Sequence, residues 1–337
     1  MKKSLNAALL LIISSFIVLS LGLIGCSQKN SNQLIIDSSL KNSSNNPQTN
    51  SSPRKNIALV MKTLTNPFFI EMEKGARKAE KEFNINLIVK TGAKETSIEQ
   101  QISIVQNLID SHVDAIVIAP GSSTELIPVL KKAQDAKIII VNVDNKLDEE
   151  TCKKFGLLNI PFISVNNEEG AYLSAKYISD KISSPEKAVI LEGIRGANNA
   201  EERKKGAIRA FSQNKNINLV ASETANWKID EAYDVISNIY KKEPDVKAIF
   251  CANDMMALGV LQYLEKTGKN DVLVAGFDAL DDAKSAIKDN KLQVTIDQQA
   301  TMQGYTGIKD AVELLEGKQI DKITLVDVKV ITRENVN

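Results

Sequence analysis

Residues 56–83 read NIALVMKTLTNPFFIEMEKGARKAEKEF, a short apolar run followed by an amphipathic stretch. The run Asn56–Met61 is nearly continuous in apolar residues, which is typical of a β-strand buried on both faces. From Pro67 to Phe83 the apolar residues recur at helical spacing. Because a strand followed by a helix predicts a βαβ unit, this stretch indicates an α/β fold with parallel sheets.

The same pair recurs along the rest of the chain. Further strands are predicted at 86–90, 115–118, 138–143, 162–165, 187–191, 217–221, 247–251, 272–276 and 293–296. Helical patterns occupy the gaps, for example 97–110, 122–135, 167–182, 199–213, 229–241, 253–266 and 300–315. So many strands exceed what one twisted sheet usually holds, so we expect two sheets of about five or six strands each.

The N-terminal segment has the layout of an export signal. Residues 1–3 give a positive start, and residues 7–25 carry no charge. The stretch Leu23–Cys26 resembles a bacterial lipobox, in which the cysteine becomes the lipid-modified first residue of the mature protein. We therefore expect a signal peptide at 1–25 and a lipid on Cys26. An uncleaved spanning anchor is the alternative, because the apolar run is near the roughly 20 residues that a spanning helix needs.

Residues 26–53 are expected to form a disordered tether between the lipid and the folded part. The stretch is rich in Asn, Ser and Gln and contains Pro47 and Pro53, so it cannot bury enough apolar surface to order itself. The mature chain is therefore expected outside the cytoplasmic membrane, lipid-anchored in the periplasm or cell envelope.

The composition excludes some functions. The 337 residues include 42 basic and 42 acidic side chains, and removing Lys2 and Lys3 leaves 40 against 42, a net charge of −2. Such a balance indicates no nucleic-acid partner. Besides Cys26 the cysteines are Cys152 and Cys251, which we expect as buried free thiols. No Gly-rich phosphate motif follows the first strand, and we predict neither a cofactor nor a metal site.

Polar and aromatic side chains follow the predicted strands, where ligands bind in open α/β sheets. They are Lys62, Thr65–Phe69, Ala119–Ser122, Asp144-Asn145, Glu201–Arg203, Asn226-Trp227, Asn253-Asp254, Asp278 and Asp297-Gln298. Sugar hydroxyls both donate and accept hydrogen bonds, so acids, amides and cations suit them. Aromatic rings suit the C–H faces of a pyranose. This inventory predicts a polyhydroxyl ligand.

Six stretches together form a specific pattern: Leu59–Phe69, Ile118–Ser123, Val141–Asp144, Trp227–Asp230, Phe250–Gly259 and Val274–Asp278. Through these stretches residues 54 to 332 resemble the bacterial periplasmic sugar-binding proteins of the ribose/allose/galactose type. Within the family the pattern is most similar to the D-allose-binding and ribose-binding proteins. The resemblance implies two Rossmann-like lobes, the type I periplasmic binding protein fold, joined by a multi-strand hinge near Val165, Gln298 and Asp327.

The resemblance also implies the lobe ranges and the ligand-binding residues. The N-terminal lobe would be 54–165 with 299–327, and the C-terminal lobe 166–298 with 328–337. The implied sugar contacts are Lys62, Asn66, Phe68, Phe69, Asp144, Arg203, Trp227, Asn253, Asp278 and Gln298.

Several of these residues have plainer alternatives. One of Phe68 and Phe69 is expected in the core, and Asn66 could simply cap the helix that opens at Pro67. Arg203 could face solvent on its helix, and the two aspartates could be ordinary loop acids.

Two departures from the family pattern bear on the sugar. Ala119 stands where ribose-type proteins carry Asn, and Asn145 stands where they carry Arg. Both changes remove hydroxyl donors, so the pattern favours a hexopyranose over ribose.

The resemblance implies a monomeric solute-binding protein that closes on a monosaccharide and delivers it to the membrane permease of an ABC transporter. A sugar sensor that presents its ligand to a chemoreceptor or histidine kinase is the alternative. A transcription regulator of this fold would need a helix-turn-helix head, where this chain has an export signal. We predict no enzymatic activity, because the acids are better explained as hydroxyl acceptors.

Overall fold

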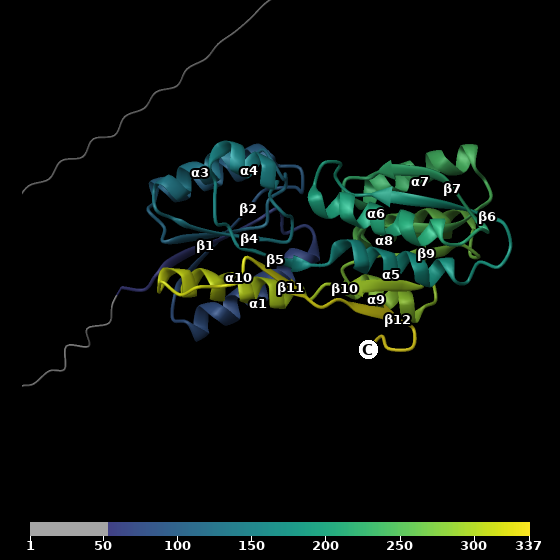
Figure 1. Cartoon of the computed structure of the whole chain (residues 1–337). Helices are drawn as coiled ribbons and strands as arrows, with labels where there is room; N and C mark the ends of the chain where they lie inside the picture. Colours follow the sequence, from purple (N-terminus) through teal and green to yellow (C-terminus); the bar gives the residue numbers. More distant parts are fainter. Residues whose placement is uncertain (1–52) are drawn as a thin grey trace, which may run out of the picture. The chain divides into compact units, whose positions relative to one another are not determined.

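The computed structural model describes residues 53–337 as twelve β-strands and ten α-helices (Figure 1). The predicted signal peptide, the lipidated Cys26 and all of the tether but Pro53 lie outside the described residues. Between residues 53 and 337 no helix is long and apolar enough to cross a membrane. The strands form two separate six-stranded sheets, so the predicted fold class of two parallel-sheet α/β lobes is confirmed.

All strand pairs of the first sheet are parallel. In spatial order its strands are β11 (Ile323–Val326), β5 (Phe162–Val165), β4 (Ile139–Val143), β3 (Ala115–Ile118), β1 (Asn56–Met61) and β2 (Asn86–Thr91). Strand β1 therefore lies inside the sheet between β3 and β2. This position explains why its side chains are nearly all buried.

The two faces of the first sheet are covered by different helices. Alternate β1 residues, Ile57 and Leu59, belong to the apolar cluster that includes residues of α1 (Pro67–Glu82) and α10 (Ala300–Leu315). The intervening Ala58 and Val60 belong to a second cluster with residues of α2 (Ile98–Asp110) and α3 (Ile127–Asp135). Since side chains alternate across a strand, a strand covered on both sides must be apolar throughout.

The second sheet repeats this plan with one antiparallel edge. Its spatial order is β12 (Lys329–Thr332), β10 (Val294–Asp297), β9 (Leu273–Ala275), β8 (Val246–Cys251), β6 (Glu186–Glu192) and β7 (Ile217–Thr224). Only β12 runs against its neighbour among these pairs. Its helices are α5 (Asn167–Ser179), α6 (Asn198–Ser212), α7 (Ile229–Lys242), α8 (Asp254–Thr267) and α9 (Asp281–Lys288), with α5 against α6 and α7 against α8.

The chain passes between the two sheets three times. It leaves the first sheet after β5, returns to it after β10, and leaves it again between β11 and β12. At the second passage Gln299 has a φ of 51°. We propose that residues 54–165 and 299–327 form the first lobe and that residues 166–298 and 328–337 form the second lobe.

The largest differences from the predicted elements have physical reasons. Helix α3 begins at Ile127, not at Ser122, and Pro128 occupies its first turn. Helix α4 (Glu149–Phe155) buries none of its residues, and the edge strands β11 and β12 are largely half-exposed. Elements without a buried face carry little hydrophobic periodicity, so the sequence pattern does not reveal them.

Candidate ligand-binding site

The ten predicted contact residues all line one small cavity between the lobes. Its volume is about 20 Å³, roughly the room for a single water molecule. The lining residues are Lys62, Asn66, Phe68, Phe69, Glu95, Asp144, Asn199, Arg203, Trp227, Asn253, Asp278 and Gln298. They come from segments that follow the carboxyl ends of strands of both sheets, where open α/β sheets place their ligands.

A buried ion pair lies on the first-lobe side of the cavity. Lys62, directly after β1, places Nζ 2.8 Å from Oδ2 of Asp144, directly after β4. The two side chains are only 4% and 3% exposed. The Lys62 ammonium also lies 5.6 Å from the centre of the Phe69 ring, close enough for a cation–π contact. The lysine charge is thus satisfied within its own lobe.

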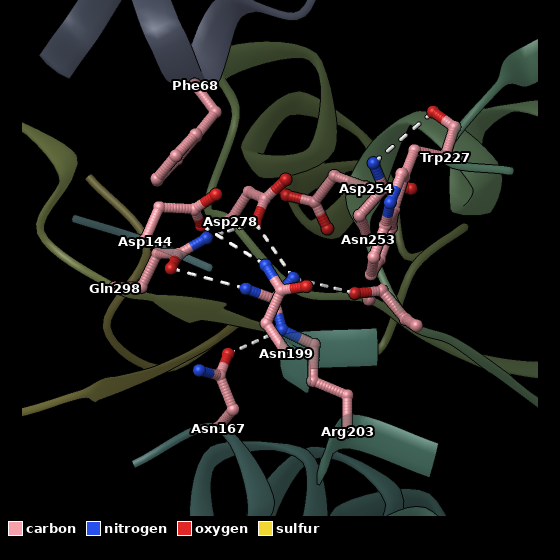
Figure 2. A network of polar contacts seen from close by, with 12 residues as sticks. Phe68, Asp144, Asn167, Asn199, Arg203, Trp227, Asn253, Asp254, Asp278 and Gln298 are labelled. Carbon is pink, nitrogen blue, oxygen red and sulfur yellow. Dashed lines mark hydrogen bonds and ion pairs between the residues drawn. The ribbon is translucent and has the colours of Figure 1, made fainter. Parts of the chain in front are cut away.

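Arg203 supplies the charge on the second-lobe side and is buried, so it does not face solvent. Its Nε donates to Oδ1 of Asn167 at 2.8 Å, and its Nη1 donates to the carbonyl of Ala252 at 2.9 Å. The guanidinium lies 3.8 Å from the centre of the Phe277 ring. These contacts fix the orientation of the planar guanidinium, and Figure 2 shows the one between Arg203 and Asn167.

Asp278 is the carboxylate partner of Arg203. Its Oδ1 lies 3.5 Å from Nη1 of Arg203 and accepts a hydrogen bond from Nε2 of Gln298 at 2.6 Å. Burial raises the pKa of the Asp278 carboxyl, and the Arg203 guanidinium opposes that rise. The second lobe therefore also neutralises its own charge.

Glu95 and Asn199 line the cavity although the sequence analysis did not single them out. Glu95 lies four residues beyond β2 and accepts a hydrogen bond from Nδ2 of Asn66 at 3.0 Å. Burial raises the pKa of the Glu95 carboxyl, while Lys62 opposes the rise. Asn199 lies in the first turn of α6 and donates from Nδ2 to Oδ1 of Asp144 at 3.3 Å. The end of β2 was the available signal for Glu95.

Two of the predicted asparagines, Asn66 and Asn253, also cap helices. Oδ1 of Asn66 caps α1 by accepting from the amide of Phe68 at 3.0 Å. Oδ1 of Asn253 caps α8 by accepting from the amide of Met256 at 2.9 Å. The amide nitrogens are engaged as well, because Nδ2 of Asn66 donates to Glu95 and Nδ2 of Asn253 donates to the carbonyl of Trp227 at 3.4 Å.

The aromatic lining comes from both lobes. Phe68 and Phe69 are both buried, with ring centres 5.0 Å apart in an edge-to-face arrangement. Figure 2 shows Phe68 reaching from α1 toward the polar network. Trp227, with a φ of 66°, closes the opposite side.

Besides Oδ2 of Asp144, which is ion-paired with Lys62, two buried polar atoms in the lining have no hydrogen-bond partner among residues 53–337. They are Nε1 of Trp227 and Oδ1 of Asn199. A buried polar group left without a partner costs about 1–3 kcal/mol. One donor and one acceptor at the same cavity fit a ligand that offers both, as a hydroxyl group does.

Asn145 does not line the cavity but contacts the second lobe. Its Oδ1 accepts from the amide of Asn199 at 3.3 Å, and Oγ of Ser123 accepts from the amide of Asn198 at 3.0 Å. The residue at the N-cap of α6 is Ala197, whose side chain cannot accept a hydrogen bond. The first lobe thus caps a helix of the second.

Comparisons with known proteins agree with this architecture. Residues 57–319 match the family described as "Periplasmic binding protein domain", and the chain belongs to this family. The D-ribose/D-allose-binding protein of Pseudomonas aeruginosa is 38% identical over 276 residues, 80% of this chain and 85% of that protein. The D-allose-binding periplasmic protein of Escherichia coli is 34% identical, over 75% of this chain and 82% of that protein.

A solved structure shows the same relationship in three dimensions. It is an ABC transporter periplasmic solute-binding protein from Actinobacillus succinogenes with bound D-allose. The TM-score is 0.80 at 38% sequence identity, covering 84% of this chain and 99% of that one. The resemblance found in the sequence is confirmed. These proteins are binding proteins, so the prediction that the chain is not an enzyme is also confirmed.

Proposed function

We propose that this chain is a solute-binding protein that captures an uncharged monosaccharide between its two lobes and delivers it to an ABC-type sugar permease. The observation that carries the proposal is the chemistry of the cavity lining. It combines three carboxylates, two cations, four amides and three aromatic rings. Acceptors, donors and flat apolar faces in this mixture fit a ring bearing several hydroxyl groups.

The charges of the lining favour a neutral ligand. Each cation already faces a carboxylate of its own lobe, in the pairs Lys62–Asp144 and Arg203–Asp278. Glu95 adds a third carboxyl, so no positive charge is left over for a ligand. A sugar phosphate or sugar acid would meet carboxylates without a free cation, which is costly in a buried site.

Capture requires the lobes to move apart and close again. The cavity in this structure is far smaller than a monosaccharide, and Asn199 of the second lobe donates directly to Asp144 of the first. A sugar would replace such cross-lobe contacts with its own hydroxyl groups. Because only the closed form offers both half-sites, the ligand would favour closure through differential contacts.

A hexopyranose of the allose type is the ligand that we propose. The relatives named for D-allose and D-ribose, and the solved neighbour with bound D-allose, support this choice. Ala119 and Asn145 support it further, since neither supplies the donors expected of a ribose-type site. Cys26 would carry a lipid that anchors a monomeric protein at the outer face of the cytoplasmic membrane.

Isothermal titration with allose, ribose, galactose and glucose tests the ligand. We expect the tightest binding for allose and no binding for glucose 6-phosphate. A thermal-shift screen provides a second readout, because a bound ligand stabilises by RT ln(1 + [L]/Kd). Tight ribose binding without hexose binding would overturn the allose assignment, and binding of none of these sugars would overturn the function.

The anchor needs a separate measurement. Mass spectrometry of the mature protein should find a lipid-modified Cys26 as the first residue. An intact Met1 would contradict the anchor without affecting the sugar site.

A further inference from the structure

Asp254 is a buried carboxylate next to the cavity that takes no part in its lining. It is the first residue of α8 and is 0% exposed. Figure 2 shows it close to Asp278. A carboxylate so far from water needs strong hydrogen-bond partners, and those partners reveal its task.

The segment 277–280, which carries Asp278, has an unusual backbone. Asp278 has a φ of 123° and Ala279 a φ of 56°. Residues other than glycine rarely adopt positive φ, because the Cβ atom then crowds the backbone. Contacts with the surrounding structure must therefore hold this segment in place.

Asp254 provides two of those contacts. Its amide donates to the carbonyl of Phe277 at 2.7 Å, and its Oδ2 accepts from the amide of Leu280 at 2.9 Å. These two hydrogen bonds hold the segment on both sides of Asp278 and Ala279, the residues with positive φ.

Thr295, in β10, completes the clamp. Its hydroxyl donates to Oδ1 of Asp254 at 2.7 Å and accepts from the amide of Ala279 at 3.1 Å. One hydroxyl thus connects the carboxylate to the centre of the segment.

Gly276 leaves the space that the clamp needs. A Cβ atom at this position would lie 2.2 Å from Oδ1 of Asp254. Any side chain here would force the carboxylate away from its hydrogen bonds.

We propose that Asp254, together with Thr295, is a positioning residue that holds the Asp278 carboxylate toward the ligand. The inference rests on the proposed function only in taking Asp278 as a ligand contact. Neither Asp254 nor Thr295 lines the cavity.

The variant Thr295→Val tests this role, because valine has nearly the shape of threonine and lacks the hydroxyl. We expect its affinity for D-allose to fall about 10- to 100-fold, since the carboxylate and an amide both lose a partner. Thr295→Ser keeps a hydroxyl and should recover most of the affinity. Asp254→Asn should resemble Thr295→Val, because an amide cannot accept at both positions.

A double-mutant cycle separates positioning from general stability. In an Asp278→Asn background, Thr295→Val should cause much less further loss of D-allose affinity than in the wild type. An undiminished further loss would show that Thr295 does not act through Asp278, and would overturn the proposal.

Hydrogen exchange of the ligand-free protein gives a readout independent of any sugar. Thr295→Val should speed amide exchange at Ala279 and Leu280, whereas Asp278→Asn should not. Unchanged exchange would overturn the clamp even if every sugar binds normally. A wild type that binds no sugar while the clamp behaves as expected would instead overturn only the proposed function.

Discussion

Nζ of Lys62 lies 2.8 Å from Oδ2 of Asp144, and both residues belong to the first lobe. The second lobe holds its own pair, Arg203 with Asp278. Each cation of the site is therefore already paired with a carboxylate before the halves meet. Opening the lobes would expose paired charges to water, and closing them on a ligand would bury no unpaired charge.

The variant Lys62→Met should damage both binding and folding. It leaves the buried Asp144 carboxylate without its cation, and breaking such a pair typically costs about 3–5 kcal/mol. We expect at least tenfold weaker sugar binding by calorimetry, roughly the effect of 1.4 kcal/mol, and a lower urea midpoint. Lys94→Met, at an exposed position of the same lobe, is the control. The double variant Lys62→Met/Asp144→Asn should lose less stability than the two single losses combined, and full additivity would contradict the coupling.

The single tryptophan should report on binding. Nε1 of Trp227 is buried without a partner among the described residues, so a sugar hydroxyl near it should change the emission. A Cβ atom on Gly193 would lie 2.0 Å from Cζ2 of Trp227, and Gly193→Ala should therefore shift the emission of the free protein and weaken binding about tenfold.

Gly196→Ala is the matched control for the tryptophan. Gly196 belongs to the same loop and has open space around it, with a φ of 84°. The variant should lower the melting temperature through backbone strain without moving the emission. If calorimetry shows that a sugar binds but the tryptophan emission does not change, the placement of Trp227 at the ligand is wrong.

Removing the cross-lobe cap should speed ligand release. The hydroxyl of Ser123 accepts from the amide of Asn198 across the cleft, and a lost helix cap costs about 0.5–2 kcal/mol. Because the proposed opening of the lobes would break this contact, Ser123→Ala should raise the dissociation rate about 2- to 30-fold in stopped-flow experiments. Ser122→Ala, whose hydroxyl bonds only within the first lobe, should leave the rate unchanged. Equal rates for both variants would argue against a cap that acts on closure.

Asp310 should make stability depend on pH. Burial raises the pKa of this carboxyl from its ordinary 3.8 to about 6. A carboxyl with a raised pKa in the folded state favours the protonated form. Its contribution to the stability of the folded state is therefore fully present below pH 3.8 and is lost as pH rises through about 6. Asp310→Asn should therefore stabilise the protein at pH 8 by about 1–2 kcal/mol and make the unfolding free energy less dependent on pH. Urea unfolding at pH 5 and pH 8 measures this effect. If the unfolding free energy of the variant changes with pH as much as that of the wild type, the prediction is wrong.

The sequence predicted the buried strands because a strand covered on both faces must be apolar throughout, as Asn56–Met61 is. It could not reveal β11 or β12, whose residues are largely half-exposed. Ten of the residues that line the cavity could be predicted through the family resemblance and the ends of the strands. Glu95 follows the end of β2 by four residues, so that strand end was a usable signal that the prediction did not include.

Local sequence patterns also did not reveal which contacts the side chains of the site make. The segment around Arg203 is rich in Lys and Glu and resembles a solvent-facing helix, yet the arginine is buried against Asn167 and Ala252. Those partners lie 36 and 49 residues away along the chain. Contacts at such separations depend on the tertiary fold and leave no trace in a short window of sequence.

The position of α10 and β11 near the end of the chain affects the order in which the protein can fold during translation. Helix α10 packs against α1, and β11 pairs with β5, so the first sheet is complete only when Val326 has left the ribosome. Five of the six strands of the second sheet lie within residues 186–297 and can assemble earlier. The lobe whose synthesis begins first therefore needs residues from near the end of the chain, and a chain truncated after Asp297 would lack α10 and leave the face of α1 that packs against it uncovered.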